Sequence, residues 1–198
     1  MVDASGAVRP GEEIDARAVD GWLRTIVRDL EGEPKVTQYS GGASNWTYRL
    51  AYANRDFVLR RPPAGTKAKS AHDMGREYKM QRALKPFYPC VPGMVGLCED
   101  ASILGVPFYV MDRVPGIILR KRLPEGLSLD EPTTRKLCVN VVDKLIELHQ
   151  VDYRAAGLTP ADLGRRLGPM TVLQHLRRGS AAAWCVARLQ RQRRDGVA

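Results

Sequence analysis

The sequence predicts an α+β fold: an antiparallel five-stranded sheet with one packed helix, preceded by a helix and followed by a longer one. Three observations lead to this prediction. Three β-type segments crowd into residues 35–61 with short links, as in hairpins. A helical pattern separates them from two later β-type segments, and a longer helical pattern covers residues 129–149. At 198 residues the chain is long enough to bury a sizeable core.

The first expected element is an amphipathic helix over residues 15–30. Gly32 and Pro34 supply a stop just beyond it. Its apolar residues recur at helical spacing, and they are Val19, Trp22, Leu23, Ile26, Val27 and Leu30. Residues 1–33 are therefore expected to form an N-terminal helical segment.

The expected sheet follows over residues 34–114. Its strands are predicted at residues 35–40, 46–52, 56–61, 94–99 and 108–113. Pro62, Pro63 and Gly65 end the third strand, and Pro86 ends the helix that resumes near Ala71. That helix carries Met74, Tyr78, Gln81 and Leu84 along one side.

Residues 115–162 are expected to form a linker and the first helix of a second, helical lobe. Ser128 and Glu131 stand in the capping-box relation, and Pro132 is tolerated in the first turn of a helix. The apolar positions of this helix form one stripe, made of Leu137, Val141, Leu145 and Leu148.

The net charge of +9 is unevenly distributed. Residues 163–198 hold eight arginines against one acid, Asp195, whereas the rest of the chain is nearly neutral. Such a run contacts phosphate backbones or anionic lipid in some proteins, but it more commonly marks a solvated or disordered end. No aromatic platform accompanies the arginines, so we expect no nucleic-acid partner.

No apolar run approaches the length of a membrane span, and the first residues lack the pattern of a signal peptide. We expect no membrane partner and a cytoplasmic location. The four cysteines have no C-x-x-C spacing and only three histidines accompany them, which disfavours a metal site. We expect four reduced, mostly buried thiols.

The run from Ser40 to Asn45 joins the first two strands, and Arg60 and Glu77 follow in order. A glycine pair there is often only a hairpin turn, Arg60 alone could be a solvated cation, and Glu77 could pair with a neighbour on its helix. Taken together, the order is that of a kinase small lobe. Glycines let backbone N–H groups approach phosphates, a guanidinium neutralises them, and a helix carboxylate holds the guanidinium in place.

Four runs give the chain a family resemblance. They are residues 38–45 (Gln-Tyr-Ser-Gly-Gly-Ala-Ser-Asn), 57–63 (Phe-Val-Leu-Arg-Arg-Pro-Pro), 70–78 (Ser-Ala-His-Asp-Met-Gly-Arg-Glu-Tyr) and 107–111 (Pro-Phe-Tyr-Val-Met). They resemble the aminoglycoside phosphotransferase and choline kinase-like family, and within it the branch related to the kinase-like domain fused to some acyl-CoA dehydrogenases. The resemblance covers roughly residues 15–165. It implies a protein-kinase-like fold and ATP-dependent phosphorylation of a hydroxyl on a small molecule.

The resemblance also implies roles for individual residues. The phosphate loop would be Gly41, Gly42, Ala43, Ser44 and Asn45. Arg60 would be the strand cation, in the place that many kinases give to lysine, and Glu77 its helix partner. In the linker, backbone groups of Asp112 and Val114 would bind the adenine edge, and Met111 would line its pocket.

The chain departs from the family pattern where catalysis is concerned. Phosphoryl transfer needs an Asp to orient the attacking hydroxyl and Asn and Asp oxygens to hold Mg²⁺. The family places these residues in a His-Gly-Asp loop and a later Asp motif, which the 198 residues do not contain. The pair His72-Asp73 lacks the following Asn and receives no catalytic role. We therefore expect a truncated phosphotransferase without catalytic or metal-binding residues of its own.

Two functions remain open. The chain is active only if a missing large lobe is supplied, or it is a non-catalytic remnant that binds nucleotide or a protein partner. An uncovered lobe surface also invites self-association. The segment from residue 163 onward has no Lys, Glu or Ile, and it is either a divergent arginine-rich helix or a stretch translated out of frame.

Overall fold

The structure is a computed structural model, and it describes residues 5–40, 45–63, 73–117, 123 and 126–163. The chain divides into two compact units, which are described separately. The sheet unit comprises Ala4–Arg82 and Pro92–Arg113. The helical unit comprises Met1–Asp3, Ala83–Val91 and Val114–Ala198.

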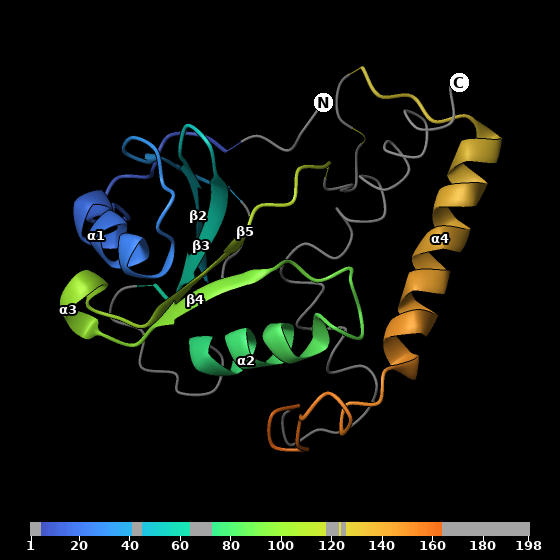
Figure 1. Cartoon of the computed structure of the whole chain (residues 1–198). Coiled ribbons are helices and arrows are strands. Elements are labelled where there is room, and N and C mark those ends of the chain that lie inside the picture. Colours follow the sequence, from blue (N-terminus) through green and yellow to red (C-terminus); the bar gives the residue numbers. More distant parts are fainter. Residues whose placement is uncertain (1–4, 41–44, 64–72, 118–122, 124–125, 164–198) are drawn as a thin grey trace. The chain divides into compact units, whose positions relative to one another are not determined.

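The sheet unit is built on five antiparallel strands (Figure 1). They are β1 (Lys35–Gln38), β2 (Trp46–Ala51), β3 (Asp56–Arg61), β4 (Met94–Cys98) and β5 (Phe108–Asp112). Their order is β1-β2-β3-β5-β4, so β5 inserts between β3 and the strand that precedes it in the chain. The predicted fold class, a five-stranded antiparallel small lobe, is confirmed. All five strands begin where the sequence predicts, and β1, β2, β4 and β5 end one or two residues earlier.

One face of the sheet is covered by α1 (Ala16–Ile26) and the short helix α3 (Ala101–Leu104). The Asp15 carboxylate caps α1 by accepting from the backbone N–H groups of Arg17 and Ala18. The main core lies under these helices, and the ring of Trp22 meets that of Phe108 edge-on at 5.0 Å between centroids. Its fully buried members include Val19, Leu23, Tyr48, Leu50, Leu59, Phe108 and Val110.

Gly96 lets α1 approach β4 closely. A Cβ atom at this position would stand 2.5 Å from Cδ1 of Ile26 and 3.1 Å from the ring of Trp22. The register between β4 and β5 also shifts between Met94 and Gly96, which marks a bulge. The helix therefore packs on the sheet at a point where only glycine fits without displacement.

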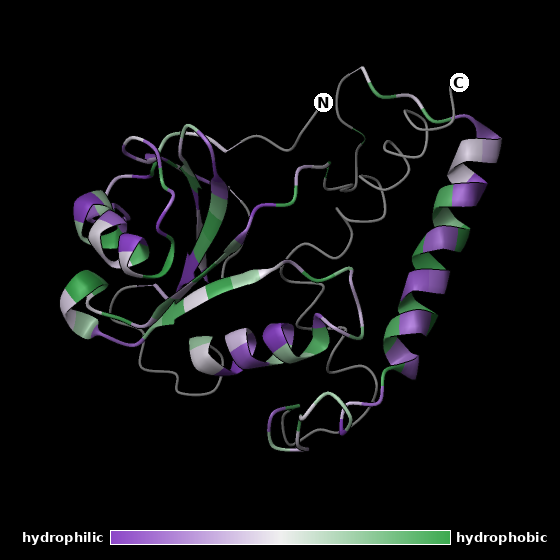
Figure 2. Ribbon diagram, viewed as in Figure 1, coloured by the Kyte–Doolittle hydropathy of each residue, from purple (hydrophilic) through white to green (hydrophobic). Residues whose placement is uncertain are grey.

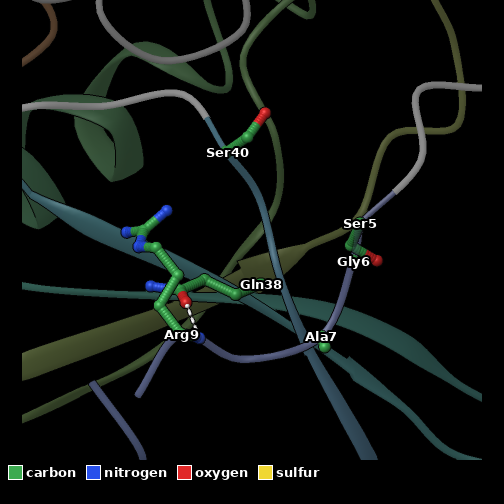
Figure 3. A pocket seen from close by; sticks show the side chains of 6 residues that line it. All are labelled: Ser5, Gly6, Ala7, Arg9, Gln38 and Ser40. Atoms are coloured by element: carbon green, nitrogen blue, oxygen red, sulfur yellow. Dashed lines mark hydrogen bonds between the residues drawn. The ribbon is translucent and has the colours of Figure 1, made fainter. Parts of the chain in front are cut away.

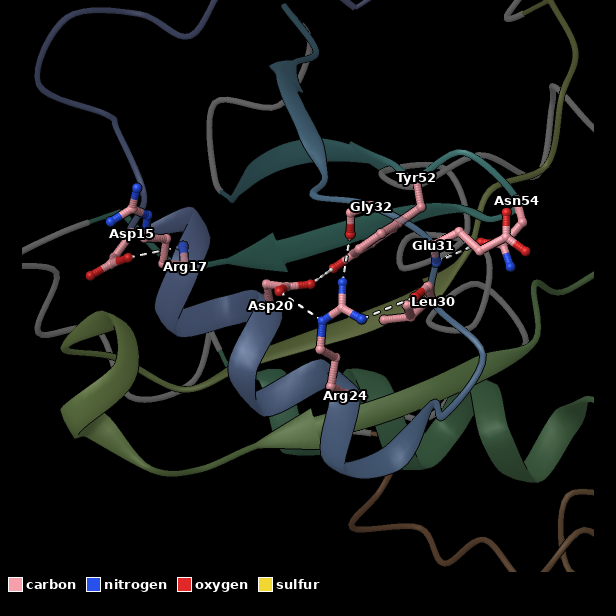
Figure 4. A network of polar contacts seen from close by, with 9 residues as sticks. All are labelled: Asp15, Arg17, Asp20, Arg24, Leu30, Glu31, Gly32, Tyr52 and Asn54. Carbon is pink, nitrogen blue, oxygen red and sulfur yellow. Dashed lines mark hydrogen bonds and ion pairs between the residues drawn. The ribbon is translucent and has the colours of Figure 1, made fainter.

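A polar network ties α1 to the segment that leads into β1 (Figure 4). Arg24 donates to Oδ2 of Asp20 at 2.9 Å and to the carbonyl oxygens of Leu30 and Gly32 at 2.9 and 2.5 Å. The Tyr52 hydroxyl donates to the other Asp20 oxygen at 2.8 Å. Burial, and then the bond to Asp20, raise the pKa of Tyr52 well above its usual range. The helix ends at Ile26, earlier than predicted, and Leu30 is buried beyond it.

The opposite face of the sheet carries α2 (Met74–Leu84), whose first turns belong to the sheet unit. A second cluster of buried residues lies there, made of Val58, Met74, Tyr109 and Met111, with Tyr39, Tyr78, Met94 and Leu97 partly buried against it. Because side chains alternate along a strand, Arg60 points to this same face as Val58. The candidate site is on this face.

The helical unit contains α4 (Glu131–Gln150), the long helix that the sequence predicts. Its N-cap is Asp130, which accepts from the Thr133 N–H, so the prediction that Ser128 caps it is wrong. Pro132 lies in the first turn as expected. Hydrophobic and polar residues alternate along α4 (Figure 2). Of the predicted apolar stripe Leu148 is buried, whereas Val141 is exposed.

Two further expectations differ from the structure. Helix α3 was not predicted, and it is a single turn between its Asp100 cap and the left-handed Gly105. Of the three cysteines in the described part of the chain, Cys98 is buried, Cys90 half-buried and Cys138 exposed, so "mostly buried" is wrong for them, and all three are free thiols. Across the described ranges, no helix has the length and apolarity needed to cross a membrane.

Candidate functional site

Arg60 and Glu77 meet on the α2 face of the sheet. Nη2 of Arg60 lies 3.7 Å from Oε2 of Glu77, and the two side chains are 9% and 16% exposed. Arg60 is held in the sheet between Thr47 on β2 and Tyr109 on β5. A solvated cation and a surface carboxylate, the two alternatives that the sequence left open, would both be more exposed than these side chains are.

The Glu77 carboxylate also bonds two other residues of the site. Its Oε1 accepts from Nδ2 of Asn45 at 3.2 Å, and its Oε2 accepts from the Tyr109 hydroxyl at 3.0 Å. Nε2 of Gln81, one turn further along α2, donates to the same hydroxyl at 3.2 Å. One carboxylate therefore connects the end of the predicted phosphate loop, the predicted strand cation and β5.

Tyr109 acts as a donor in this network. Burial raises the pKa of its hydroxyl far above its usual range, more than the nearby Arg60 lowers it. The shift favours the protonated phenol, which is the form that donates to Glu77. This fixes one carboxylate oxygen while the other accepts from Asn45.

Arg60 has donor capacity left over. Its Nε is buried and has no hydrogen-bond partner, although a buried polar atom normally has one. A guanidinium offers five N–H donors in a fork that matches phosphate oxygens. The residues present at this position therefore suit a ligand that brings acceptor oxygens to the sheet, as a nucleotide triphosphate does.

The predicted phosphate loop is described at its two ends. Gly41, Gly42, Ala43 and Ser44 lie outside the described residues. Asn45 is 3% exposed and bonds Glu77, as noted above. On the other side, Ser40 lines a pocket of about 370 Å³ together with Ser5, Gly6, Ala7, Arg9 and Gln38 (Figure 3).

The strand that enters the loop is braced from outside by the N-terminal segment. Gly6 exchanges two backbone hydrogen bonds with Gln38, at 2.9 and 3.0 Å. The Gln38 side chain is buried, accepts from the Arg9 N–H at 2.9 Å and donates to Glu12 at 2.5 Å. Glu12 in turn accepts from the Tyr48 hydroxyl through its carbonyl oxygen. The sequence pattern gave no sign of this brace, because an isolated bridge has no periodicity.

The predicted linker residues fall in different units. Met111 is buried among Val58, Met74 and Tyr109, and Asp112 ends β5. The Asp112 N–H donates to the Gly93 carbonyl at 2.8 Å, so its carbonyl oxygen is the backbone group it can offer to an adenine edge. Val114 belongs to the helical unit.

The structure adds residues that the sequence did not single out. Val58 lies two positions before Arg60 on β3, and strand alternation alone could have placed it on the same face. Tyr109 stands opposite Arg60, which depends on β5 pairing with β3 and cannot be read from the chain order. Tyr39, next to the loop, packs against the same cluster.

The structure describes only one residue of the pair His72-Asp73. His72 lies outside the described residues, and Asp73 caps α2 by accepting from the Arg76 N–H at 2.8 Å. Among the described residues, no group of three or more His, Cys, Asp or Glu side chains could hold a metal ion.

Comparisons with known proteins show the family of the chain. Residues 35–197 match the model of the phosphotransferase enzyme family (APH). Mouse acyl-CoA dehydrogenase family member 10 is 38% identical over 153 residues, which are 76% of this chain and 14% of that protein. Human acyl-CoA dehydrogenase family member 11 is 32% identical over 161 residues, or 79% of this chain and 20% of that protein.

A solved structure from Ralstonia eutropha, assigned to the aminoglycoside phosphotransferases, is 32% identical with a TM-score of 0.60. It covers 77% of this chain, which in turn spans 43% of that protein. The sheet and its helices have the small-lobe architecture of that protein-kinase-like fold. The matched range includes Asn45, Arg60 and Glu77. The chain belongs to the phosphotransferase enzyme family.

Proposed function

We propose that the sheet unit is the nucleotide-binding lobe of an ATP-dependent phosphotransferase that acts on a small-molecule hydroxyl. The buried Arg60–Glu77 pair carries the proposal, because a guanidinium with an unpartnered buried Nε needs acceptor oxygens. ATP would supply the phosphoryl group. Arg60 and the backbone of residues 41–45 would hold its phosphates, and Met111, Asp112 and Val114 would hold its adenine.

The residues that would bind the acceptor and carry out the catalytic step are not among the described ones. The 198 residues contain no His-Gly-Asp loop, so the catalytic Asp and the Mg²⁺ ligands would have to come from residues outside them. Relatives named as acyl-CoA dehydrogenases make a hydroxylated acyl-CoA the first acceptor to test. The second candidate, favoured by the same missing loop, is nucleotide binding without turnover by these residues.

Three further parts of the proposal concern the surroundings of the protein. Free thiols at Cys90, Cys98 and Cys138 suit a reducing compartment, and we propose the cytoplasm. We propose that no nucleic acid is bound, because the recognisable nucleotide site accounts for the ligand chemistry on the sheet. Exposed Val139, Val142 and Ile146 along α4 support association through the helical unit.

Titration calorimetry with ATP tests the nucleotide proposal. The matched variants are Arg60→Gln, Arg60→Lys and Arg55→Gln, since Arg55 pairs with Asp29 at an exposed turn. A charged hydrogen bond contributes about 1.5–3 kcal/mol, so Arg60→Gln should weaken ATP about 10- to 150-fold. Arg60→Lys should keep more of the affinity because it keeps the charge, and Arg55→Gln should match the wild type. A wild-type chain that binds no ATP at millimolar concentration would exclude the proposal.

A further inference from the structure

Arg113 stands between the two linker residues proposed to contact adenine, yet its side chain turns back onto the sheet. The side chain is 12% exposed. Its Nη1 donates to Oδ2 of Asp56 at 2.8 Å, and its Nε donates to the Tyr39 hydroxyl at 3.0 Å. Its backbone N–H donates to the Asp56 carbonyl at 3.0 Å. Arg113, just after β5, is thus fixed by three hydrogen bonds. Two of them go to Asp56 at the start of β3, and one goes to Tyr39 just after β1.

The Asp56 carboxylate holds a second cation. Nε and Nη2 of Arg49 on β2 bind its two oxygens at 2.8 and 2.9 Å, as a fork. The bond to Asp56 raises the pKa of Arg49 above its usual value. Two guanidiniums on one carboxylate form a rigid, charge-assisted group at the end of the sheet where β3 begins and β5 ends.

Tyr39 is the other anchor, and it follows the last residue of β1 directly before the loop. Its N–H donates to the Thr47 carbonyl at 3.0 Å, and its ring packs against the cluster that contains Val58 and Met111. The bond from Arg113 to Tyr39 spans 74 positions of sequence. It therefore joins the stem of the phosphate loop to the start of the linker.

The linker is also held from the β4 side. The Asp112 N–H donates to the Gly93 carbonyl at 2.8 Å. A Cβ atom at Gly93 would stand 2.2 Å from Oδ2 of Asp112, so a larger residue there would displace that carboxylate. Contacts on both sides thus leave the backbone around Asp112 and Arg113 little freedom to turn.

We propose that Arg113, anchored by Tyr39 and Asp56, is a positioning residue for the adenine end of the nucleotide site. We call these three residues the linker bridge. This inference rests on the proposed function. The bridge fixes the direction in which the chain leaves β5, and hence where the Asp112 carbonyl points. A base recognised by backbone groups is sensitive to such an orientation, because a misplacement of 1 Å is enough to lose a hydrogen bond.

The test separates adenine binding from phosphate binding. The ligands are ATP, adenosine and inorganic tripolyphosphate. Their affinities are measured by calorimetry for the wild type, Arg113→Gln, Arg113→Lys, Tyr39→Phe and the control Arg55→Gln. Arg55 also pairs with an aspartate, Asp29, but at an exposed turn. Amide hydrogen exchange of the peptide over residues 108–113 is followed without ligand.

We expect Arg113→Gln to weaken adenosine and ATP by about tenfold each and to leave tripolyphosphate within about twofold. Exchange over residues 108–113 should quicken, and Tyr39→Phe should do the same to a smaller extent. Arg113→Lys should restore part of the affinity, since an ammonium can pair with Asp56 but cannot reach both anchors as a fork. Arg55→Gln should change none of these values.

Three results would overturn the inference. Equal losses of adenosine and tripolyphosphate affinity would mean a general structural role, and unchanged adenosine affinity or unchanged exchange in Arg113→Gln would mean no positioning role. In these cases the wild type still binds ATP and the proposed function stands. A wild type that binds none of the three ligands would instead remove the proposed function, and the role of the bridge in nucleotide binding with it.

Discussion

Glu77→Ala gives the sharpest test of how the site is built. The change removes the partner of the Arg60 guanidinium and the acceptor for the Tyr109 hydroxyl, and it takes one hydrogen bond from Asn45. Removing one member of a buried ion pair costs about 3–5 kcal/mol, because a charge is left uncompensated in a low-dielectric site. We expect a loss near the lower end of this range, since the pair is 3.7 Å apart and Glu77 is 16% exposed. Against a typical total of about 5–15 kcal/mol, this is a large fraction.

The assay is urea unfolding of Glu77→Ala, Glu77→Gln, Arg60→Met and the double variant Arg60→Met/Glu77→Gln. Glu77→Gln keeps an acceptor for Tyr109 but leaves the Arg60 charge unpaired, so it should lose about 1–3 kcal/mol. The double variant should be less destabilised than the sum of its single changes by about 1 kcal/mol or more, because the charge is gone together with its partner. A loss below about 1 kcal/mol for Glu77→Ala, or additive single changes, would refute the reasoning.

Two other predictions concern the opposite face of the sheet. Gly96→Ala should destabilise the protein by about 1–3 kcal/mol, seen as a lower urea midpoint, since its Cβ would press on the Trp22 ring at 3.1 Å; an unchanged midpoint would contradict the packing argument. Burial raises the pKa of Asp20, but bonds from Arg24 and Tyr52 outweigh it and lower the pKa below its usual value. The network therefore stabilises the fold above the unfolded pKa of about 4, and this contribution is lost as the pH falls through the lower folded value. The stability gap between wild type and Asp20→Asn should accordingly shrink between pH 7 and pH 3, and a constant gap would exclude this linkage.

Much of the sheet unit could be predicted because its elements carry strong periodic signals. The hairpin links fixed the antiparallel sheet, and the spacing from Arg60 to Glu77 placed a cation and a carboxylate on elements that do meet. Helix α3 gave no such signal, because four residues are too few for a helical period. At α4 the cap is Asp130, two positions after the predicted Ser128, and its side chain satisfies the first turn.

The contacts between distant segments could not be predicted. Tyr109 faces Arg60 only because β5 inserts beside β3, and chain order alone allows other arrangements. The Tyr39–Arg113 bond joins residues 74 positions apart that no local rule connects. Both depend on the strand order, which long-range packing decides rather than local propensity.

The backbone hydrogen bonds between Gly6 and Gln38 affect where the protein can be shortened for expression. β1 is an edge strand, and an uncovered edge is a template for pairing with another molecule. The N-terminal segment occupies that edge, whereas the edge at β4 is interrupted by its bulge. An expression boundary set at Asp15, the N-cap of α1, would remove the segment that covers this edge of β1. Such a truncation should favour edge-to-edge aggregation, so a shortened version of the protein should begin no later than Ser5.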